Sequence, residues 1–339
     1  MNTPASISAR LAHPVDLVTA LPYLLGFHPR DSLVVVTIQP GSPPTVGLML
    51  RADLPPPGAE HELAEQLCAP LRARGTGAVM IVVVGGPECV PAAVAVLRTA
   101  LDDLGVVVVN VLWAEATTHG ARWSCLDEPA TSGVLPDPSD NGVAAASALA
   151  GVVTFATRDE LARLVEPDDE ETLGHRGALL DAAVRDLGTD DPAPSASDRG
   201  LDLVRAAVDA AAVGRLPTTD DEIVRLAVAL SDPLIRDSCL GWCLGGTAAA
   251  AERLWQALTR ATPAPEVAEP ASLAALSAYL RGDGALAGIA LDRAEAAWPG
   301  HTLSTLLHYV VANAIPPRRL DRFVRDATAH AALAMADAR

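Results

Sequence analysis

The hydrophobic pattern of this chain changes once along its length, and that change limits the possible folds more than any other feature. Up to about residue 126, short β-branched apolar runs alternate with segments of helical spacing, and beyond it almost only helical spacing remains. Alternating strands and helices predict an α/β layered domain, whereas helical spacing alone predicts a helical array. We therefore expect an α/β domain over residues 1–140 and an all-helical domain over residues 141–339.

The first two apolar runs, residues 31–38 and 45–52, are predicted to form an antiparallel β-hairpin. Six residues rich in proline and glycine separate them, and a parallel crossover needs about a dozen or more. If the hairpin closes near residues 41 and 42, Asp31 lies across from Ala52. Further strands are predicted at residues 78–84, 106–113 and 122–126, with helices at 60–74 and 91–104. The expected architecture is a mixed sheet packed between helices.

The second half is predicted to be helical, with one hairpin of a recognisable kind. Residues 188–200 and 262–270 are expected to be connections. The second helix of a tetratricopeptide repeat has a small, a large apolar and a small residue at fixed distances from the turn glycine, followed by a proline. Counted from Gly282, the four positions are occupied by Ala287, Leu291, Ala294 and Pro299, which fit the pattern. The preceding helix lacks the pattern, and no copy occurs 34 residues earlier. The expected helical segments are 158–165, 169–187, 200–214, 218–230, 232–244, 247–261, 271–281, 284–297, 301–314 and 317–336.

Composition excludes several classes of function. The formal charge is −17, and all 25 basic residues are arginine, so no lysine is available for a Schiff base or a P-loop. Both halves are acidic, which argues against nucleic-acid binding. The apolar runs are too short for a membrane span of about 20 residues. An odd number of scattered cysteines and the lack of a secretory-type N-terminus predict a cytoplasmic protein.

Several phrases of the sequence stand out: PVDL at 14–17, PYLLGFHP at 22–29, DSLVVV at 31–36, LRADLP at 50–55, the segment from Trp255 to Pro263, and RGDGALA at 281–287 with IALDRA at 289–294. Together these phrases resemble the actinobacterial DUF4192 family. The resemblance implies no activity or cofactor, because the family is a domain of unknown function. Family members often carry a cysteine-rich segment after a Trp-Ser pair, whereas Trp123-Ser124-Cys125 is followed here by no further cysteine, so no metal or redox role is transferred.

The predicted hairpin gathers the most site-like group of side chains. It brings His28, Arg30 and Asp31 near Arg51 and Asp53. This set of two arginines, two carboxylates and an imidazole suits a small anionic or zwitterionic ligand. Arginine can make bidentate contacts with the ligand, and histidine can act as an acid or a base. The same residues also suit a structural ion-pair lattice at the sheet edge, which is the more common arrangement.

Other candidate sites have simpler structural explanations. Gly85-Gly86 lacks the spacing of a phosphate loop and suits a tight turn. Cys239 and Cys243 are expected to pack in the core, and no catalytic, metal or cofactor motif is found. His301 and His308 are expected to be surface or capping residues. The acidic run 166–171 is expected to begin a helix.

Two functions follow from the residues. The first is a non-enzymatic module that binds a protein partner or a second copy of itself through the helical region, because catalytic signatures are missing and helical hairpins build contact surfaces. The alternative is a small-molecule binding protein or enzyme that uses the His28, Arg30, Asp31, Arg51 and Asp53 group.

Overall fold

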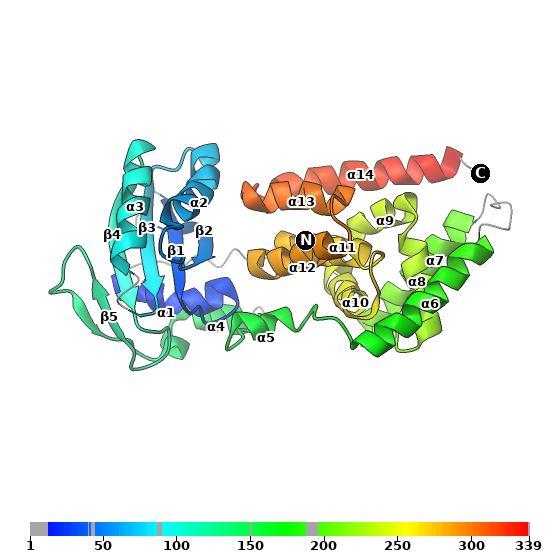
Figure 1. Ribbon diagram of the computed structural model, residues 1–339, viewed down its shortest axis with the longest axis horizontal. Coiled ribbons are helices and arrows are strands. Elements are labelled where there is room, and N and C mark those ends of the chain that lie inside the picture. Colours follow the sequence, from blue (N-terminus) through cyan, green and yellow to red (C-terminus); the bar gives the residue numbers. More distant parts are fainter. Residues whose placement is uncertain are drawn as a thin grey trace. The chain divides into compact units, whose positions relative to one another are not determined.

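A computed structural model describes residues 13–39, 41, 45–86, 90–149, 151–187 and 196–337. The chain divides into two compact units, Ala5–Leu161 and Ala162–Arg339, each taken by itself below (Figure 1). The first unit holds the sheet, and the second is helical. Whether either unit folds alone, with a domain boundary after residue 140, stays a prediction.

The first unit is an α/β layer built on one mixed, six-stranded sheet, as predicted. Its strand order is β2-β1-β3-β4-β5-β6, in which only β3 and β4 are parallel. The strands are β1 (Ser32–Gln39), β2 (Thr45–Asp53), β3 (Ala78–Val84), β4 (Val107–Ala114), β5 (Arg122–Cys125) and β6 (Ser132–Val134). The parallel pair is joined through helix α3 (Val90–Asp103), as a parallel crossover requires.

The first two strands form the predicted antiparallel hairpin, but in a different register. Ala52 lies across from Leu33 rather than Asp31, and the Asp31 carbonyl accepts a hydrogen bond from the Leu54 amide. The register shifts within the strands, between Val36 and Ile38, because of a β-bulge or similar irregularity. Most of the connecting turn, residues 40 and 42–44, lies outside the described residues.

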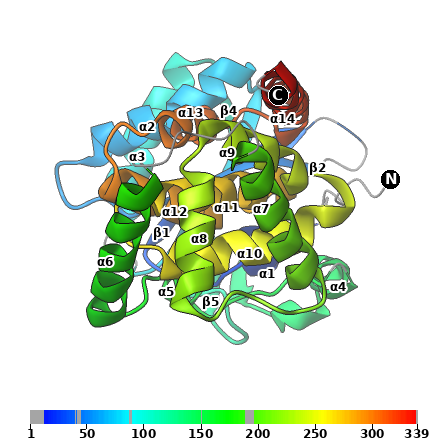
Figure 2. The same ribbon diagram turned by 90° about the vertical axis from the view of Figure 1, so that its right-hand side faces the viewer.

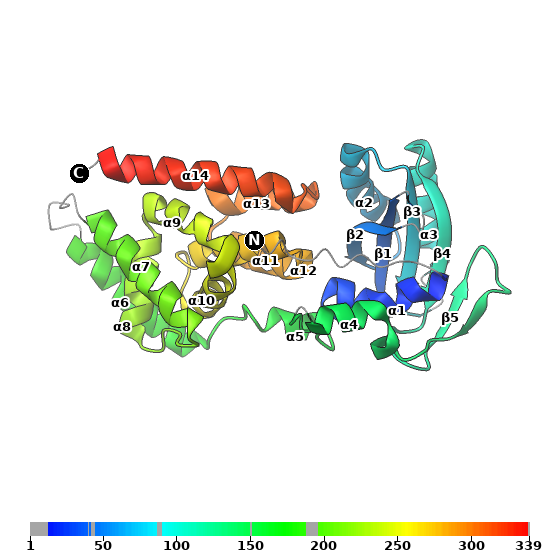
Figure 3. The same ribbon diagram turned by 180° about the vertical axis from the view of Figure 1, so that it is seen from behind.

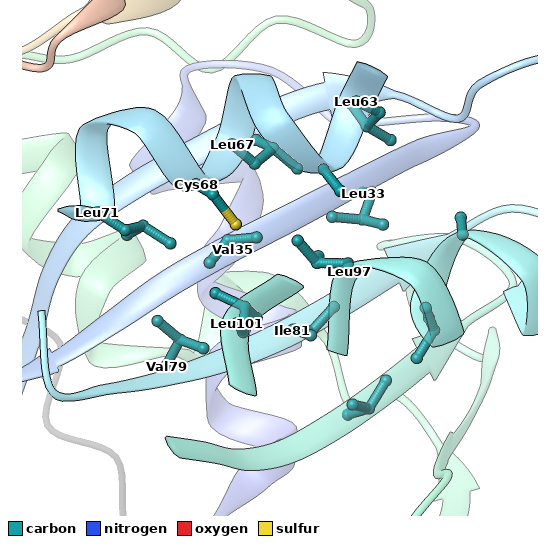
Figure 4. Packing of buried hydrophobic residues seen from close by; sticks show 14 of the residues in the cluster. Leu33, Val35, Leu63, Leu67, Cys68, Leu71, Val79, Ile81, Leu97 and Leu101 are labelled. Carbon is teal, nitrogen blue, oxygen red and sulfur yellow. The ribbon is translucent and has the colours of Figure 1, made fainter. Parts of the chain in front are cut away.

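Each face of the sheet carries its own apolar layer because β3 is apolar at every position and β1 is apolar from Leu33 to Val36. On one face, Leu33, Val35 and Ile81 pack under α2 (Glu60–Arg74) and α3 (Figure 4). On the other, Val34 and Val82 pack under α1 (Pro14–Leu25). A strand with two buried faces needs such continuous apolar runs.

The sequence analysis missed three elements of this unit. Helix α1 carries Pro14 in its first turn and Pro22 near its end, and such prolines read as interruptions. Strand β6 and the helix α4 (Gly142–Leu149) arise in or just after a stretch rich in turn-forming residues. The short helix α5 (Arg158–Ala162) follows, and its first residue, Arg158, bears on the site described below.

The second unit consists of helices in its described part. Figure 2 shows α6, α8 and α7 packed side by side, as their contacts confirm. The helices are α6 (Glu170–Leu187), α7 (Ala196–Ala212), α8 (Asp220–Leu230), α9 (Pro233–Leu240), α10 (Ala248–Ala261), α11 (Ala268–Arg281), α12 (Gly284–Ala297), α13 (Thr302–Ala312) and α14 (Pro317–Asp337). Both predicted connections end earlier than expected, because α7 begins at Ala196 and α11 begins at Ala268. Residues 188–195 of the first connection, predicted over 188–200, lie outside the described part.

Helix α11 is the centre of the helical unit. Its residues from Ala268 to Ala278 are all buried, and it packs against α10, α12, α13 and α14. The high alanine content of α11 allows these close approaches, because a small side chain keeps helix axes near one another. Gly282, in a left-handed conformation, and Asp283, which caps α12, make the turn of the α11–α12 hairpin. Its likeness to a tetratricopeptide repeat stays a prediction.

Candidate functional site

The five predicted site residues lie at one end of the sheet, and we call them the sheet-end cluster: His28, Arg30, Asp31, Arg51 and Asp53. Arg30, Asp31 and Asp53 are exposed, whereas His28 and Arg51 are half-buried. Asp31 precedes β1 and lies against Gly85, which follows β3. His28 contacts Thr117, which follows β4. The cluster therefore lies beside the carboxyl ends of the two parallel strands, where open α/β sheets commonly bind ligands.

Arg51 is the best-anchored member of the cluster. Its Nε and Nη2 atoms donate to the Ser32 hydroxyl at 3.0 and 2.8 Å, and Nη2 lies 2.5 Å from the Asp53 carboxylate. Its guanidinium also lies 5.7 Å from the centre of the Phe27 ring. No hydrogen bond of Nη1 is found within the described residues, which leaves that nitrogen able to donate to a ligand.

Charged groups act on Arg51 in opposite directions within the described part of the chain. Burial lowers the pKa of Arg51, Asp53 opposes this shift, and the positive charge of Arg158 adds to it. Neither Arg158 nor Arg30 forms a side-chain hydrogen bond or ion pair within the described residues. Because Asp53, the one carboxylate that pairs with Arg51 among the described residues, is itself 77% exposed, the guanidinium retains attraction for a further anion.

Arg158 reaches the cluster through a short main-chain connection. Phe155 forms an isolated parallel bridge with Phe27, in which the Phe155 amide donates to Gly26 and the His28 amide donates to Phe155. Three residues later, α5 begins with Arg158. This contact spans more than a hundred residues of sequence, and nothing local in either segment predicted it.

His28 is held in place by Thr117, at 2.9 Å between Nδ1 and the hydroxyl oxygen. Burial lowers the pKa of His28, the contact with Thr117 opposes this, and the positive charge of Arg30 lowers it further. The imidazole is therefore neutral at neutral pH, and a neutral ring both donates and accepts hydrogen bonds.

Acidification is expected to destabilise the native protein through His28. The native pKa lies below the usual 6.5, so as the pH falls from 6.5 towards the native value the unfolded chain binds a proton that the native protein does not. The free energy of unfolding should fall across that window, and His28→Gln should remove this part of the decrease. Denaturant unfolding at about pH 7.5 and about pH 5.5 measures it. An unchanged pH dependence in His28→Gln would contradict the assignment.

Asp31 and Gly85 hold each other in uncommon backbone conformations. Asp31 has a φ of 42°, and Gly85 has a φ of 142°. A Cβ atom on residue 85 would lie 2.8 Å from Asp31 Oδ1 and 3.2 Å from Asp31 Cα. Residues kept in such conformations often cluster at functional sites. The positive φ of Gly85 favours glycine, as a tight turn would require, but residues 87–89 lie outside the described part, so the tight turn stays a prediction.

Gly85→Ala is expected to lower the free energy of unfolding by about 2 kcal/mol, because alanine disfavours this φ and its methyl group meets Asp31. Asp31→Ala in the same chain removes one of the clashing atoms. In urea unfolding, the loss of stability in the double variant should therefore be smaller than the sum of the losses in the two single variants. Strict additivity would show that the two residues do not touch.

The other candidates have structural roles. Cys239 and Cys243 are buried, and burial raises the pKa of Cys243 to about 11, which keeps its thiol protonated. Glu170 and Glu171 occupy the first turn of α6, as expected of the acidic run. Within the described residues, no group of three or more metal-ligating side chains comes together.

One buried group in the helical unit was not predicted, and it is also structural. His301 lies 3.1 Å from Glu269 through Nε2 and 3.5 Å from the Ser272 hydroxyl through Nδ1, an arrangement like that of a hydrolase triad. However, Nδ1 accepts the Ser304 amide and so caps α13, and all four residues are at most 4% exposed. The expectation of a capping role is confirmed for His301, but the residue is not on the surface.

The family comparison agrees with the resemblance found in the sequence. Residues 14–318 match the family described as a domain of unknown function, DUF4192, and the chain belongs to that family. No curated protein and no solved structure matches the chain. None of the described helices has the length and apolar content needed to cross a bilayer.

Proposed function

We propose that the α/β unit binds a small anionic ligand at the sheet-end cluster. One observation carries the proposal: the half-buried Arg51 guanidinium keeps Nη1 without a hydrogen bond in the described structure and is paired there with one exposed carboxylate, Asp53, while the positive charge of Arg158 lowers its pKa. An anion placed between the two guanidinium groups would relieve their repulsion and accept their free donors. The four described cysteines are free thiols, which supports the cytoplasm as the place of action.

The remaining members of the cluster suit a ligand of mixed polarity. Asp31 offers an exposed carboxylate to a cationic or hydroxyl group, and the neutral His28 offers both a donor and an acceptor. Ser32 fixes the Arg51 fork by accepting two of its hydrogen bonds and donating its own to the Arg30 carbonyl at 2.6 Å. A preorganised guanidinium loses little entropy when a ligand binds.

Thermal unfolding in the presence of small anions tests this function. Phosphate, sulfate, citrate and acetate are compared at constant ionic strength, because a ligand that binds only the native state raises its melting temperature. At least one multivalent anion should stabilise the wild type, and Arg158→Gln should abolish most of that shift. Arg72→Gln, on the exposed end of α2, is the matched control and should retain it. Equal shifts in all three proteins would refute binding at the cluster.

A second candidate function is self-association through the helical unit. Apolar side chains are exposed on its last two helices, with Leu306 and Tyr309 one turn apart on α13 and Phe323 and Leu333 on α14. Exposed apolar groups of this kind are typical of contact surfaces when they are gathered rather than scattered. Sedimentation velocity over a series of protein concentrations tests it, and a monomer at every concentration would contradict it.

A further inference from the structure

The outer face of α14 carries a concentration of positive charge that is unusual for this acidic chain. Arg318, Arg322 and Arg325 recur at spacings of four and three residues and so share one face, and Arg319 lies beside them. We call these four exposed arginines the basic stripe. The opposite face of the same helix is buried through Leu320, Val324, Ala331 and Met335.

The basic stripe is only partly neutralised. Arg322 and Arg325 form exposed ion pairs within the helix, with Asp326 at 3.6 Å and Asp321 at 3.1 Å. Arg318 and Arg319 make no side-chain hydrogen bond or ion pair within the described residues. Exposed pairs of this kind contribute little to stability, so the stripe keeps a net positive charge that is available for binding.

A complementary surface exists in the same unit. Arg176 joins the segment before α6 to the start of α8, because it donates to Asp168 and to Asp220 at 2.7 Å each. This contact gathers exposed carboxylates from both segments into what we call the acidic patch. Its members are Glu166, Asp169, Glu170, Glu171, Asp221 and Glu222.

The stripe and the patch lie on different sides of the helical unit. Figures 1 and 3 show α14 along one side of it and the start of α6 on the other. One copy therefore does not bring its own two surfaces together. We propose that the basic stripe of one copy docks on the acidic patch of a second copy, an inference that rests on self-association of the helical unit. Such a contact joins unlike surfaces, so each copy would bind two neighbours in a ring or an open chain.

The contact must overcome the repulsion between two chains of charge −17 each. Repulsion between whole molecules acts at long range and is screened by salt, whereas ion pairs at the contact act at short range. Association should therefore be greatest at intermediate ionic strength and should weaken about tenfold or more in high salt. The exposed Phe323 and Leu333 on α14 supply apolar area next to the stripe.

Charge reversal of the full chain tests the proposal. Arg318→Glu with Arg319→Glu reverses the charge of the stripe at its unpaired members, and Glu166→Arg with Glu171→Arg removes most of the negative charge of the patch. In sedimentation velocity, the wild type should gain mass with concentration, and each reversed protein should lose about tenfold or more in association constant. Mixing the two reversed proteins should restore association, because the unchanged stripe of the patch variant then meets the unchanged patch of the stripe variant. Arg72→Glu with Arg74→Glu, at the exposed end of α2 in the other unit, changes the net charge by the same amount as the stripe variant and should leave association unchanged.

The outcomes separate this inference from self-association itself. A wild type that remains a monomer overturns both. Association that persists unchanged in both reversed proteins overturns the assigned surfaces and leaves self-association standing. Binding of a fluorescent DNA duplex that the stripe reversal removes, without self-association of the wild type, assigns the stripe to nucleic acid and overturns the proposal. Restoration on mixing supports it.

Discussion

Trp255→Ala is expected to destabilise the helical unit by about 3–5 kcal/mol. The Trp255 side chain is fully buried in α10, beside Cys243 and against the central helix α11. Alanine would leave a cavity in a core built from alanine and leucine, and backbone packed this closely relaxes only partly into such a space. Differential scanning calorimetry of the full chain measures the effect as a lower melting temperature.

The calorimetric trace also tests the two-domain organisation. If the units are domains, Trp255→Ala should lower the transition of the helical unit and leave that of the α/β unit in place. Trp298→Ala is the matched control, because this side chain is 46% exposed, and it should cost about 1 kcal/mol or less. One shared transition that shifts as a whole would contradict independent domains, and no shift at all would contradict the burial of Trp255.

Arg51→Met is expected to weaken anion binding about 100-fold, because the ligand loses a charged and preorganised donor group. Methionine keeps apolar contact with Phe27, the Ser32 hydroxyl keeps its acceptor in the Arg30 carbonyl, and Asp53 is already exposed. The fold should therefore survive. The concentration at which the stabilising anion raises the melting temperature measures the affinity.

Arg51→Lys gives a matched comparison. Lysine keeps the positive charge but lacks the planar guanidinium that contacts both Ser32 and Asp53. We therefore expect the affinity for the anion to fall about tenfold. If Arg51→Met binds the anion as tightly as the wild type does, the anion binds elsewhere.

The sequence predicted the interior elements of the sheet well because their apolar patterns are strong and local. Helix α2 and strand β3 have the predicted bounds, since leucines at helical spacing and an uninterrupted apolar run leave little ambiguity. Helix α1 was missed because proline was taken as an interruption, although Pro14 occupies a helix position where its missing amide is not needed. The hairpin register was wrong because an irregularity inside a strand leaves no clear mark in the sequence.

The candidate site was predictable only as far as the hairpin reaches. Strand pairing brings Arg51 and Asp53 to the start of β1, as expected, although Ser32 rather than Asp31 holds Arg51. Thr117 and Arg158 reach the cluster through contacts between distant segments, which no local periodicity encodes. Whether the cluster is a binding site or an ion-pair lattice depends on those later residues.

Calorimetric titration of the full chain with phosphate, and separately with citrate, tests anion binding at the sheet-end cluster most directly. We expect saturable binding of at least one of the two anions at a single site, weakened about tenfold or more in Arg158→Gln and unchanged in Arg72→Gln. Anion binding at the cluster is contradicted if neither anion binds saturably, or if Arg158→Gln binds as tightly as the wild type.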